Sequence, residues 1–227
     1  MIEREFIKDG KEALFIKEYL RERFRTALIS KIDVVKTPLV TRIIVHAARP
    51  AYVIGRKGQN IRQATEELKE KFGVENPQIE VVAVQNPVLD AQVQAQRIAL
   101  ALERDLSSWR RQMHATLRRI MDAGARGAEI VIKGKLGARG AKKRKERVYA
   151  GYMKKVGDPV RLVDAGHAVA KTRWGTIGVH VYIVHPDKRF PDQITIPEAP
   201  PAEVESGGNS EGEGAKGEGD TRSETAT

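Results

Sequence analysis

Two glycines enclose two basic residues at positions 55–58, where the chain reads Gly55-Arg56-Lys57-Gly58. Apolar residues precede this segment, which we call the GxxG loop, and a helical pattern follows it. Because glycine has no Cβ, a sugar-phosphate chain can approach such a turn closely. The positive end of the following helix dipole and the charges of Arg56 and Lys57 favour an anion at the same place. The spacing therefore predicts a loop that binds a nucleic-acid backbone.

The segments around this loop have the pattern of a small α+β domain. Apolar residues recur at helical spacing after the loop, and the predicted strand 41–47 lies before it, with a second strand, 78–84, after the breaker Asn76-Pro77. Further upstream we expect a helix over 11–28 and a short strand over 32–36. The order helix, strand, strand, helix, helix, strand is typical of a type II KH domain, whose GxxG loop clamps backbone nucleotides.

A second candidate site is the helix predicted over residues 109–123, after a possible N-cap at Ser107-Ser108. At about 100° per residue, its large apolar residues fall on one arc. Its basic residues fall on an adjacent arc, and they are Arg110, Arg111, His114 and Arg118. Arginine can hold a phosphate through two hydrogen bonds and keeps its charge at physiological pH. The arrangement favours a row of phosphate contacts, and the alternative is a solvated helix face.

A third candidate site is the basic patch between residues 139 and 147. It contains one acidic residue, Glu146, and six cations, namely Arg139, Lys142, Lys143, Arg144, Lys145 and Arg147. Such a density of charge favours a polyanion. Because the patch falls between two expected strands, we expect an extended loop that lies on RNA. A localisation-type basic tract or a solvated loop is the alternative.

The remaining pattern indicates a second α+β domain. A helix over 91–106 and the helix over 109–123 precede four extended segments, expected at 128–133, about 147–154, 160–169 and 176–184. The last 30 residues are rich in Glu, Gly, Ser and Pro without a hydrophobic period, which is typical of disorder. We therefore expect three parts: a KH domain over 1–87, a two-layer α/β domain over 88–190 and a disordered acidic tail over 191–227.

The distribution of charge points to a nucleic acid as partner. The 227 residues carry a formal charge of +10, and residues 191–227 hold nine acidic and two basic residues, which leaves +17 on residues 1–190. So basic a region repels itself unless a polyanion neutralises it. A membrane surface would compete, but the sequence has no long apolar run and no lipidation signal. Because aromatic residues make up only 5% of the chain, contacts to phosphate are favoured over base stacking.

Enzyme and metal functions find little support. Cysteine is absent and no H-E-x-x-H motif occurs, so we expect no metal site and no cofactor. Asp164 and His167 lack an accompanying nucleophile motif. The glycines at 134 and 140 are too far apart for a Walker loop, and Lys142 does not directly follow the second. The N-terminus has no signal-peptide core, and we expect a cytoplasmic protein without catalytic residues.

Taken together and in this order, the motifs make residues 1–187 resemble a known family. It is the KH-bearing family of the third small-subunit ribosomal protein, in its archaeal or eukaryote-like form. The resemblance rests on residues 53–61, on Arg110-Arg111-x-Met113, and on the glycine-containing segments 124–127, 132–137 and 175–179. It implies a place in the ribosome, in the head of the small subunit, with 16S-type rRNA, mRNA and neighbouring head proteins as partners.

The resemblance also implies that the protein lines the channel through which mRNA enters. In the bacterial branch, two arginines and a lysine of the basic helix help to unwind structured mRNA. Arg110 and Arg111 match the arginines, whereas His114 stands at the lysine position and departs from that pattern. Two other classes stay open at this point: a free KH regulator that binds RNA outside the ribosome, and a nucleic-acid lyase or nuclease.

Overall fold

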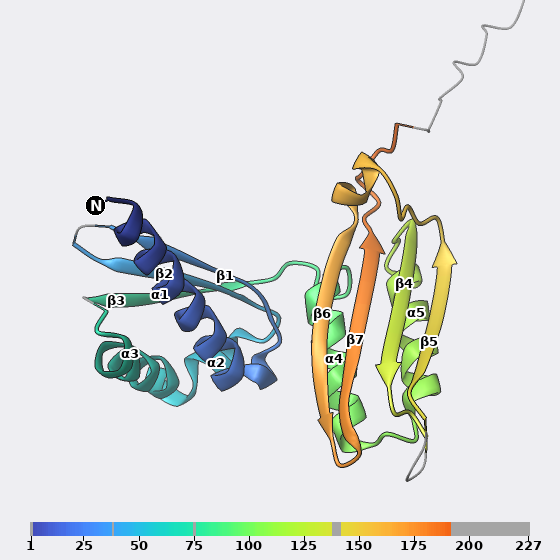
Figure 1. Ribbon diagram of the computed structural model, residues 1–227, viewed down its shortest axis with the longest axis horizontal. Coiled ribbons are helices and arrows are strands. Elements are labelled where there is room, and N and C mark those ends of the chain that lie inside the picture. Colours follow the sequence, from blue (N-terminus) through green and yellow to red (C-terminus); the bar gives the residue numbers. More distant parts are fainter. Residues whose placement is uncertain (1, 38, 75, 138–141, 192–227) are drawn as a thin grey trace, which may run out of the picture. The chain divides into compact units, whose positions relative to one another are not determined.

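The structure is a computed structural model that describes residues 2–37, 39–74, 76–137 and 142–191. Its helices and strands divide into an N-terminal set and a C-terminal set (Figure 1). The N-terminal set comprises α1 (Ile2–Arg23), the 3₁₀ helix η1 (Arg25–Ala27), β1 (Ile29–Lys36), β2 (Thr41–Ala47), α2 (Pro50–Ile54), the 3₁₀ helix η2 (Arg56–Gly58), α3 (Gln59–Phe72) and β3 (Pro77–Ala83).

The three N-terminal strands form one sheet in the order β1-β2-β3. β1 pairs with β2 antiparallel, and β2 pairs with β3 parallel, which together with the helices is the fold of a type II KH domain, as predicted. Ile43 and Val45 are among the buried side chains of β2, and they alternate with more exposed ones because successive side chains of a strand point to opposite faces. They pack with Leu20 of α1 and Leu68 of α3, so one apolar core holds both helices on the sheet.

The C-terminal set is a two-layer α/β domain, also as predicted. It comprises α4 (Ala91–Arg104), α5 (Trp109–Asp122), β4 (Gly127–Gly134), β5 (Arg144–Gly151), the 3₁₀ helix η3 (Asp158–Leu162), β6 (Asp164–Thr172) and β7 (Gly175–Val184). The sheet has the order β5-β4-β7-β6, and every neighbouring pair is antiparallel. Both helices lie on one face of it, with α4 against β6 and β7 and α5 against β4 and β5 (Figure 1).

The contact of α4 with β6 is unusually close. A Cβ added to Gly166 in β6 would lie 2.1 Å from the backbone oxygen of Ala91, so only glycine fits there. Asp90 caps the helix by accepting a hydrogen bond from the backbone N–H of Val93 at 2.9 Å. A carboxylate oxygen of Asp164 accepts a second one from the backbone N–H of Ala91 at 2.8 Å. These contacts fix the start of α4 on the sheet.

Several expected boundaries differ from the observed ones. The first helix ends at Arg23 rather than at Leu28, and β1 begins at Ile29 rather than at Ile32. The first helix begins at Ile2 rather than at Lys11, because the helix runs through Gly10, which a helix interior tolerates at a cost of about 1 kcal/mol. Residues 160–162 belong to the 3₁₀ helix η3, which starts beside Pro159, and the strand follows only at Asp164. β5 begins at Arg144 rather than near Arg147, because its first residues pair with the end of β4. The expected tail, 191–227, lies outside the described residues except for Pro191.

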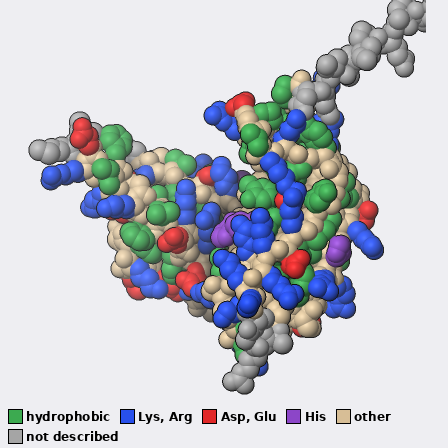
Figure 2. Space-filling model, turned by 45° about the vertical axis from the view of Figure 1, so that its right-hand side comes forward, with side chains coloured by type: hydrophobic (Ala, Val, Ile, Leu, Met, Phe, Trp, Pro, Cys, Tyr) green, Lys and Arg blue, Asp and Glu red, His purple; other side chains and the backbone are tan. Residues whose placement is uncertain are grey.

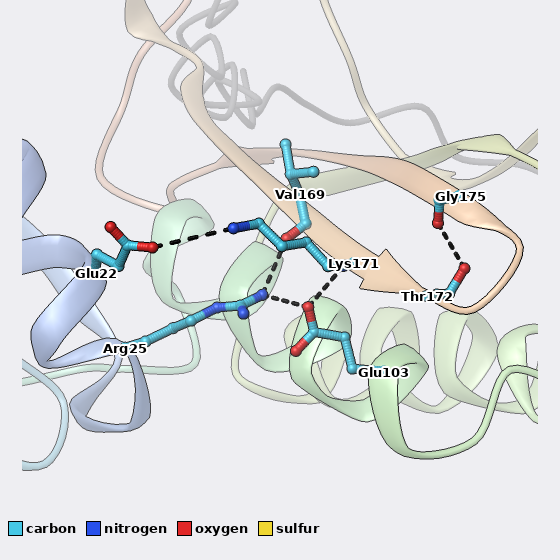
Figure 3. Close-up of polar contacts among 7 residues, drawn as sticks. All are labelled: Glu22, Arg25, Glu103, Val169, Lys171, Thr172 and Gly175. Carbon is cyan, nitrogen blue, oxygen red and sulfur yellow. Dashed lines mark hydrogen bonds and ion pairs between the residues drawn. The ribbon is translucent and has the colours of Figure 1, made fainter.

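Polar contacts join the two sets of elements between η1, α4 and β6 (Figure 3). The guanidinium of Arg25 forms an ion pair with Glu103 and donates a hydrogen bond to the backbone oxygen of Val169 at 3.1 Å. Glu103 also accepts a bond from the backbone N–H of Lys171 at 2.7 Å. Because one carboxylate serves both partners, it fixes η1 against α4 and β6.

Candidate nucleic-acid interface

The GxxG loop is a tight turn whose backbone requires glycine at its first position. Gly55 ends α2 with φ +72° and ψ −178°, a conformation available almost only to glycine. A Cβ placed there would lie 2.5 Å from Cγ of Asn60, whose side-chain amide donates to the backbone oxygen of Tyr52 at 3.0 Å. Gly58 (φ +75°) is the N-cap residue of α3, and a Cβ added there would meet no atom within 4 Å. The loop therefore presents backbone that a bulky chain can approach.

A hollow of about 490 Å³ lies beside this loop, and residues of η2 and α3 line it. Three of them are exposed cations, Arg56, Lys57 and Arg62, and one is the carboxylate Glu66. Lys57 adopts a left-handed conformation (φ +52°) that turns the chain between the two glycines. Sequence reasoning did not select Arg62. Its place in the first turn of α3, where an anion would meet the helix N-terminus, is the signal that could have found it.

α5 separates apolar and basic side chains as its periodicity predicts. Met113, Leu117 and Ile120 are buried against the sheet. The four predicted binding residues, Arg110, Arg111, His114 and Arg118, are all exposed. None of the four forms an ion pair with a carboxylate among the described residues. Hydrogen bonds from Ser107 and the charge of Arg111 lower the pKa of the nearby Asp105 carboxyl.

Two details of α5 differ from simple expectation. The guanidinium of Arg110 lies over the ring of Trp109, 4.8 Å from its centroid, which restrains the side chain without neutralising it. Ser108 precedes the helix, but its hydroxyl donates to the backbone oxygen of Asp105 at 3.1 Å and makes no cap hydrogen bond. The N-terminal N–H groups of the helix are thus without the expected serine cap.

The described part of the basic patch, residues 142–147, is mostly strand rather than loop. Residues 144–147 form the first half of β5, paired with 131–134 of β4, and Arg139 lies outside the described residues. Lys142, Lys143, Arg144 and Lys145 are exposed. Because side chains alternate along a strand, the cations divide between the two faces of the sheet: Lys145 and Arg147 lie on the face without helices, and Arg144 lies on the other. An extended patch therefore becomes two smaller ones.

Arg147 differs from the other described cations of the patch because it has a carboxylate partner. Its Nε lies 2.5 Å from Glu129, a residue only 5% exposed, and Lys155 approaches the same carboxylate at 2.9 Å. The guanidinium also lies over the ring of Tyr149. Two cations around one buried carboxylate leave a net positive charge, so this place on the sheet stays basic.

The helix-free face of the second sheet also carries two adjacent histidines. His167 of β6 and His180 of β7 pair in register, and their ring centroids lie 4.6 Å apart. Burial, with the nearby His167 and Lys133, lowers the pKa of His180 from its usual 6.5. Lys and Arg side chains gather over the surface formed by this domain (Figure 2). Asp164, which sequence analysis considered beside His167, instead lies near His185 at 3.9 Å.

The structure brings two of the predicted sites into one domain and leaves the third in the other. α5 and β5 contact each other across the second core, whereas the GxxG loop belongs to the KH core. Within the described ranges no group of three or more His, Cys, Asp or Glu side chains could hold a metal ion. No helix among those residues is long and apolar enough to cross a membrane.

By its fold and its basic surfaces, the chain belongs to the class of KH-domain proteins that bind nucleic acids. Family models match both halves of the chain: "KH domain" over residues 16–89 and "Ribosomal protein S3, C-terminal domain" over residues 98–183. The chain is 50% identical over 199 residues to small ribosomal subunit protein uS3 of Methanocaldococcus jannaschii, which covers 87% of this chain and 94% of that protein.

Two further relatives carry the same name. The protein of Methanococcus aeolicus is 44% identical over 88% of this chain and 95% of its own length. That of Methanocella arvoryzae is also 44% identical, over 86% of this chain and 69% of its own length. The chain therefore belongs to the family of small ribosomal subunit protein uS3, and the resemblance inferred from its motifs is confirmed. These relatives are named as ribosomal proteins and not as enzymes, in agreement with the expectation of a non-enzymatic chain.

Proposed function

We propose that this protein is a structural component of the head of the small ribosomal subunit, where it binds 16S-type rRNA and lines the channel through which mRNA enters. The observation that carries the mRNA contact is the exposed row of α5, whose cations have no carboxylate partner among the described residues. Family membership supports the ribosomal role. The protein would act in cytoplasmic ribosomes, beside neighbouring head proteins, without cofactor, metal or membrane.

The proposal divides the work among three surfaces. The patch at 142–147, with Arg139, neutralises rRNA phosphates and anchors the protein. α5 faces incoming mRNA and holds its backbone, because a channel that passes every message needs contacts to phosphate rather than to bases. The GxxG loop clamps a backbone of either RNA. We also propose the divisions 1–87, 88–190 and 191–227 as KH domain, second domain and acidic tail.

Unwinding of structured mRNA would be passive in this scheme. Arg110 and Arg111 hold single-stranded mRNA by its phosphates while the moving ribosome supplies the work. His114 adds a hydrogen-bonding ring where a third permanent cation would give a stronger grip. Any unwinding contribution therefore rests mainly on the two arginines.

The test is translation through an mRNA hairpin by ribosomes that carry Arg110→Ala with Arg111→Ala. We expect slower translation of a hairpin-containing message and little change on an unstructured one, because the first requires the strand to be held. A matched control removes two arginines that already have carboxylate partners, Arg42 (with Glu80) and Arg161 (with Asp158). Equal rates on both messages for the Arg110 and Arg111 variant would contradict the proposed contact.

Sedimentation of cell extract tests the ribosomal role itself. A component of the subunit travels with it, whereas a free KH regulator stays near the top of the gradient. If the protein were found only as a free monomer, the proposal as a whole would fail.

A further inference from the structure

A pocket lined by residues of both the KH domain and the second domain gathers four arginines that belong to none of the three surfaces above. Its volume is about 270 Å³, and it lies where α4 and α5 meet the segment around Leu28. The cations that line it are Arg49, Arg97, Arg104 and Arg119. Arg97 and Arg104 lie seven residues apart, on one face of α4, and Arg119 comes from α5.

No acidic residue lines this pocket, which distinguishes it from the basic hollow beside the GxxG loop and from the one on the second sheet. Glu66 lies in the hollow beside the GxxG loop, and Glu129 lies in the one on the sheet. None of the four arginines forms an ion pair with a carboxylate of the described residues. Like charges placed together without a counter-charge raise the free energy of the folded protein unless an anion joins them.

One of the four arginines, Arg119, is held in place by hydrogen bonds within α5. A guanidinium nitrogen of Arg119 donates to the hydroxyl of Thr116 at 3.0 Å, and its Nε donates to the backbone oxygen of Ala115 at 3.2 Å. Thr116 is only 1% exposed, so the hydroxyl that receives this bond is held in the core. Because the side chain is already ordered, less conformational entropy is lost when a ligand binds.

The electrostatic environment of Arg97 agrees with this geometry. Burial, with the neighbouring positive charges of Arg119 and Arg49, lowers the pKa of the Arg97 guanidinium from its usual value. The guanidinium stays charged at physiological pH, since arginine in proteins does not lose its proton there. An anion in the pocket would offset both the burial and the repulsion.

We propose that the pocket of Arg49, Arg97, Arg104 and Arg119 holds a phosphate group of the rRNA backbone. The proposal deepens the rRNA-binding function proposed above and rests on it. Phosphate fits because several guanidinium groups can share its oxygens through paired hydrogen bonds. Polar contacts join η1 and β1 to α4 near this pocket. The Gln96 amide, next to Arg97 in the chain, donates to the backbone oxygen of Ile29, the first residue of β1, at 2.8 Å, and Arg25 of η1 forms an ion pair with Glu103. A phosphate there would bridge Arg49 of the KH domain and the arginines of the second domain.

The test measures binding of the full chain to a transcript of small-subunit rRNA at several salt concentrations. For Arg97→Gln with Arg119→Gln, we expect the slope of log affinity against log salt to be shallower by about one, as for one lost phosphate contact. The control removes two paired arginines, through Arg42→Gln with Arg161→Gln, and should change the slope by less than half as much. A pocket variant with the slope of the control would overturn the proposal.

The stability of the RNA-free protein against denaturant is a second measurement. If the arginines had a purely structural role, the pocket variant would be less stable than the parent protein. Because the substitutions relieve repulsion, the pocket variant should unfold at the same or a higher denaturant concentration than the parent protein. A marked loss of stability would show that the arginines serve the fold and would overturn the proposal.

Inorganic phosphate distinguishes the two sources of the ligand. If millimolar phosphate stabilises the parent protein but not the variant, and the rRNA slope also falls, the pocket takes an RNA phosphate. If phosphate stabilises the parent while the rRNA slope is unchanged, the pocket binds a free anion and the proposal is wrong. If the parent protein does not bind the transcript, both the proposed function and the pocket proposal are wrong. If the parent binds the transcript and the pocket variant has the same salt slope as the control variant, the pocket proposal is wrong and the rRNA-binding function remains supported.

Discussion

The clash at Gly55 makes substitution of the two loop glycines a sharp test of the GxxG geometry. In Gly55→Ala, the new Cβ meets Asn60 Cγ at 2.5 Å and the backbone keeps φ +72° with ψ −178°. The backbone strain costs about 1–3 kcal/mol, and displacement of Asn60 from its bond to Tyr52 costs about 1 kcal/mol more. We therefore expect the KH domain to lose about 2–4 kcal/mol of unfolding free energy.

Gly58→Ala is the matched control for this prediction. It has a similar φ of +75°, but no atom lies within 4 Å of the added Cβ and ψ is near that of a left-handed helix. Only the left-handed penalty remains, about 1–2 kcal/mol. The two variants therefore share their sign of φ and differ in the clash with Asn60.

Urea denaturation followed by fluorescence and circular dichroism measures both variants. A third variant, Gly55→Ala with Asn60→Ala, removes the clash but keeps the backbone strain. It should be less destabilised than the sum of its two single variants by about 1 kcal/mol, since the residues are in contact. Equal losses for Gly55→Ala and Gly58→Ala, or strict additivity in the third variant, would refute the reasoning.

Two further predictions concern the helix-free face of the second sheet. Glu129→Gln should lower the unfolding free energy by about 1–2 kcal/mol, because two partly exposed cations lose their shared buried carboxylate. The control Glu80→Gln, in an exposed ion pair, should change it by less than about 0.5 kcal/mol. Burial and nearby cationic groups lower the pKa of His180. The folded state therefore binds fewer protons than the unfolded state just below pH 6.5, and the unfolding free energy should fall as the pH decreases through that value. His180→Asn should weaken this loss in urea titrations at about pH 7 and about pH 5.5, and the exposed His114→Asn should retain it.

Either result can contradict the contacts described. Equal effects of Glu129→Gln and Glu80→Gln would mean that the buried ion pairs carry no more free energy than a surface pair. An unchanged pH dependence in His180→Asn would mean that this histidine does not govern the acid-side loss of stability.

The sequence pattern predicted those features that depend on residues close together in the chain. The strand at 41–47 alternates buried and exposed residues as its sequence does, and α5 buries the arc of Met113, Leu117 and Ile120. The helix after the GxxG loop begins at Gln59, directly after the second glycine, as expected. Periodicity predicts such features because residues two, three or four apart share a face through the geometry of the backbone alone.

Features that depend on residues far apart in the chain were decided only by the tertiary structure. Pairing with β4 extends β5 back to Arg144, and the buried carboxylate of Glu129 takes Arg147 as a partner, although 18 residues separate them in the chain. The pocket of Arg49, Arg97, Arg104 and Arg119 exists because the chain around Leu28 and Arg49 lies beside α4 and α5. Each of these arginines is unremarkable in its own segment, since charge repulsion and ion pairing depend on distance in space, which the order of residues does not reveal.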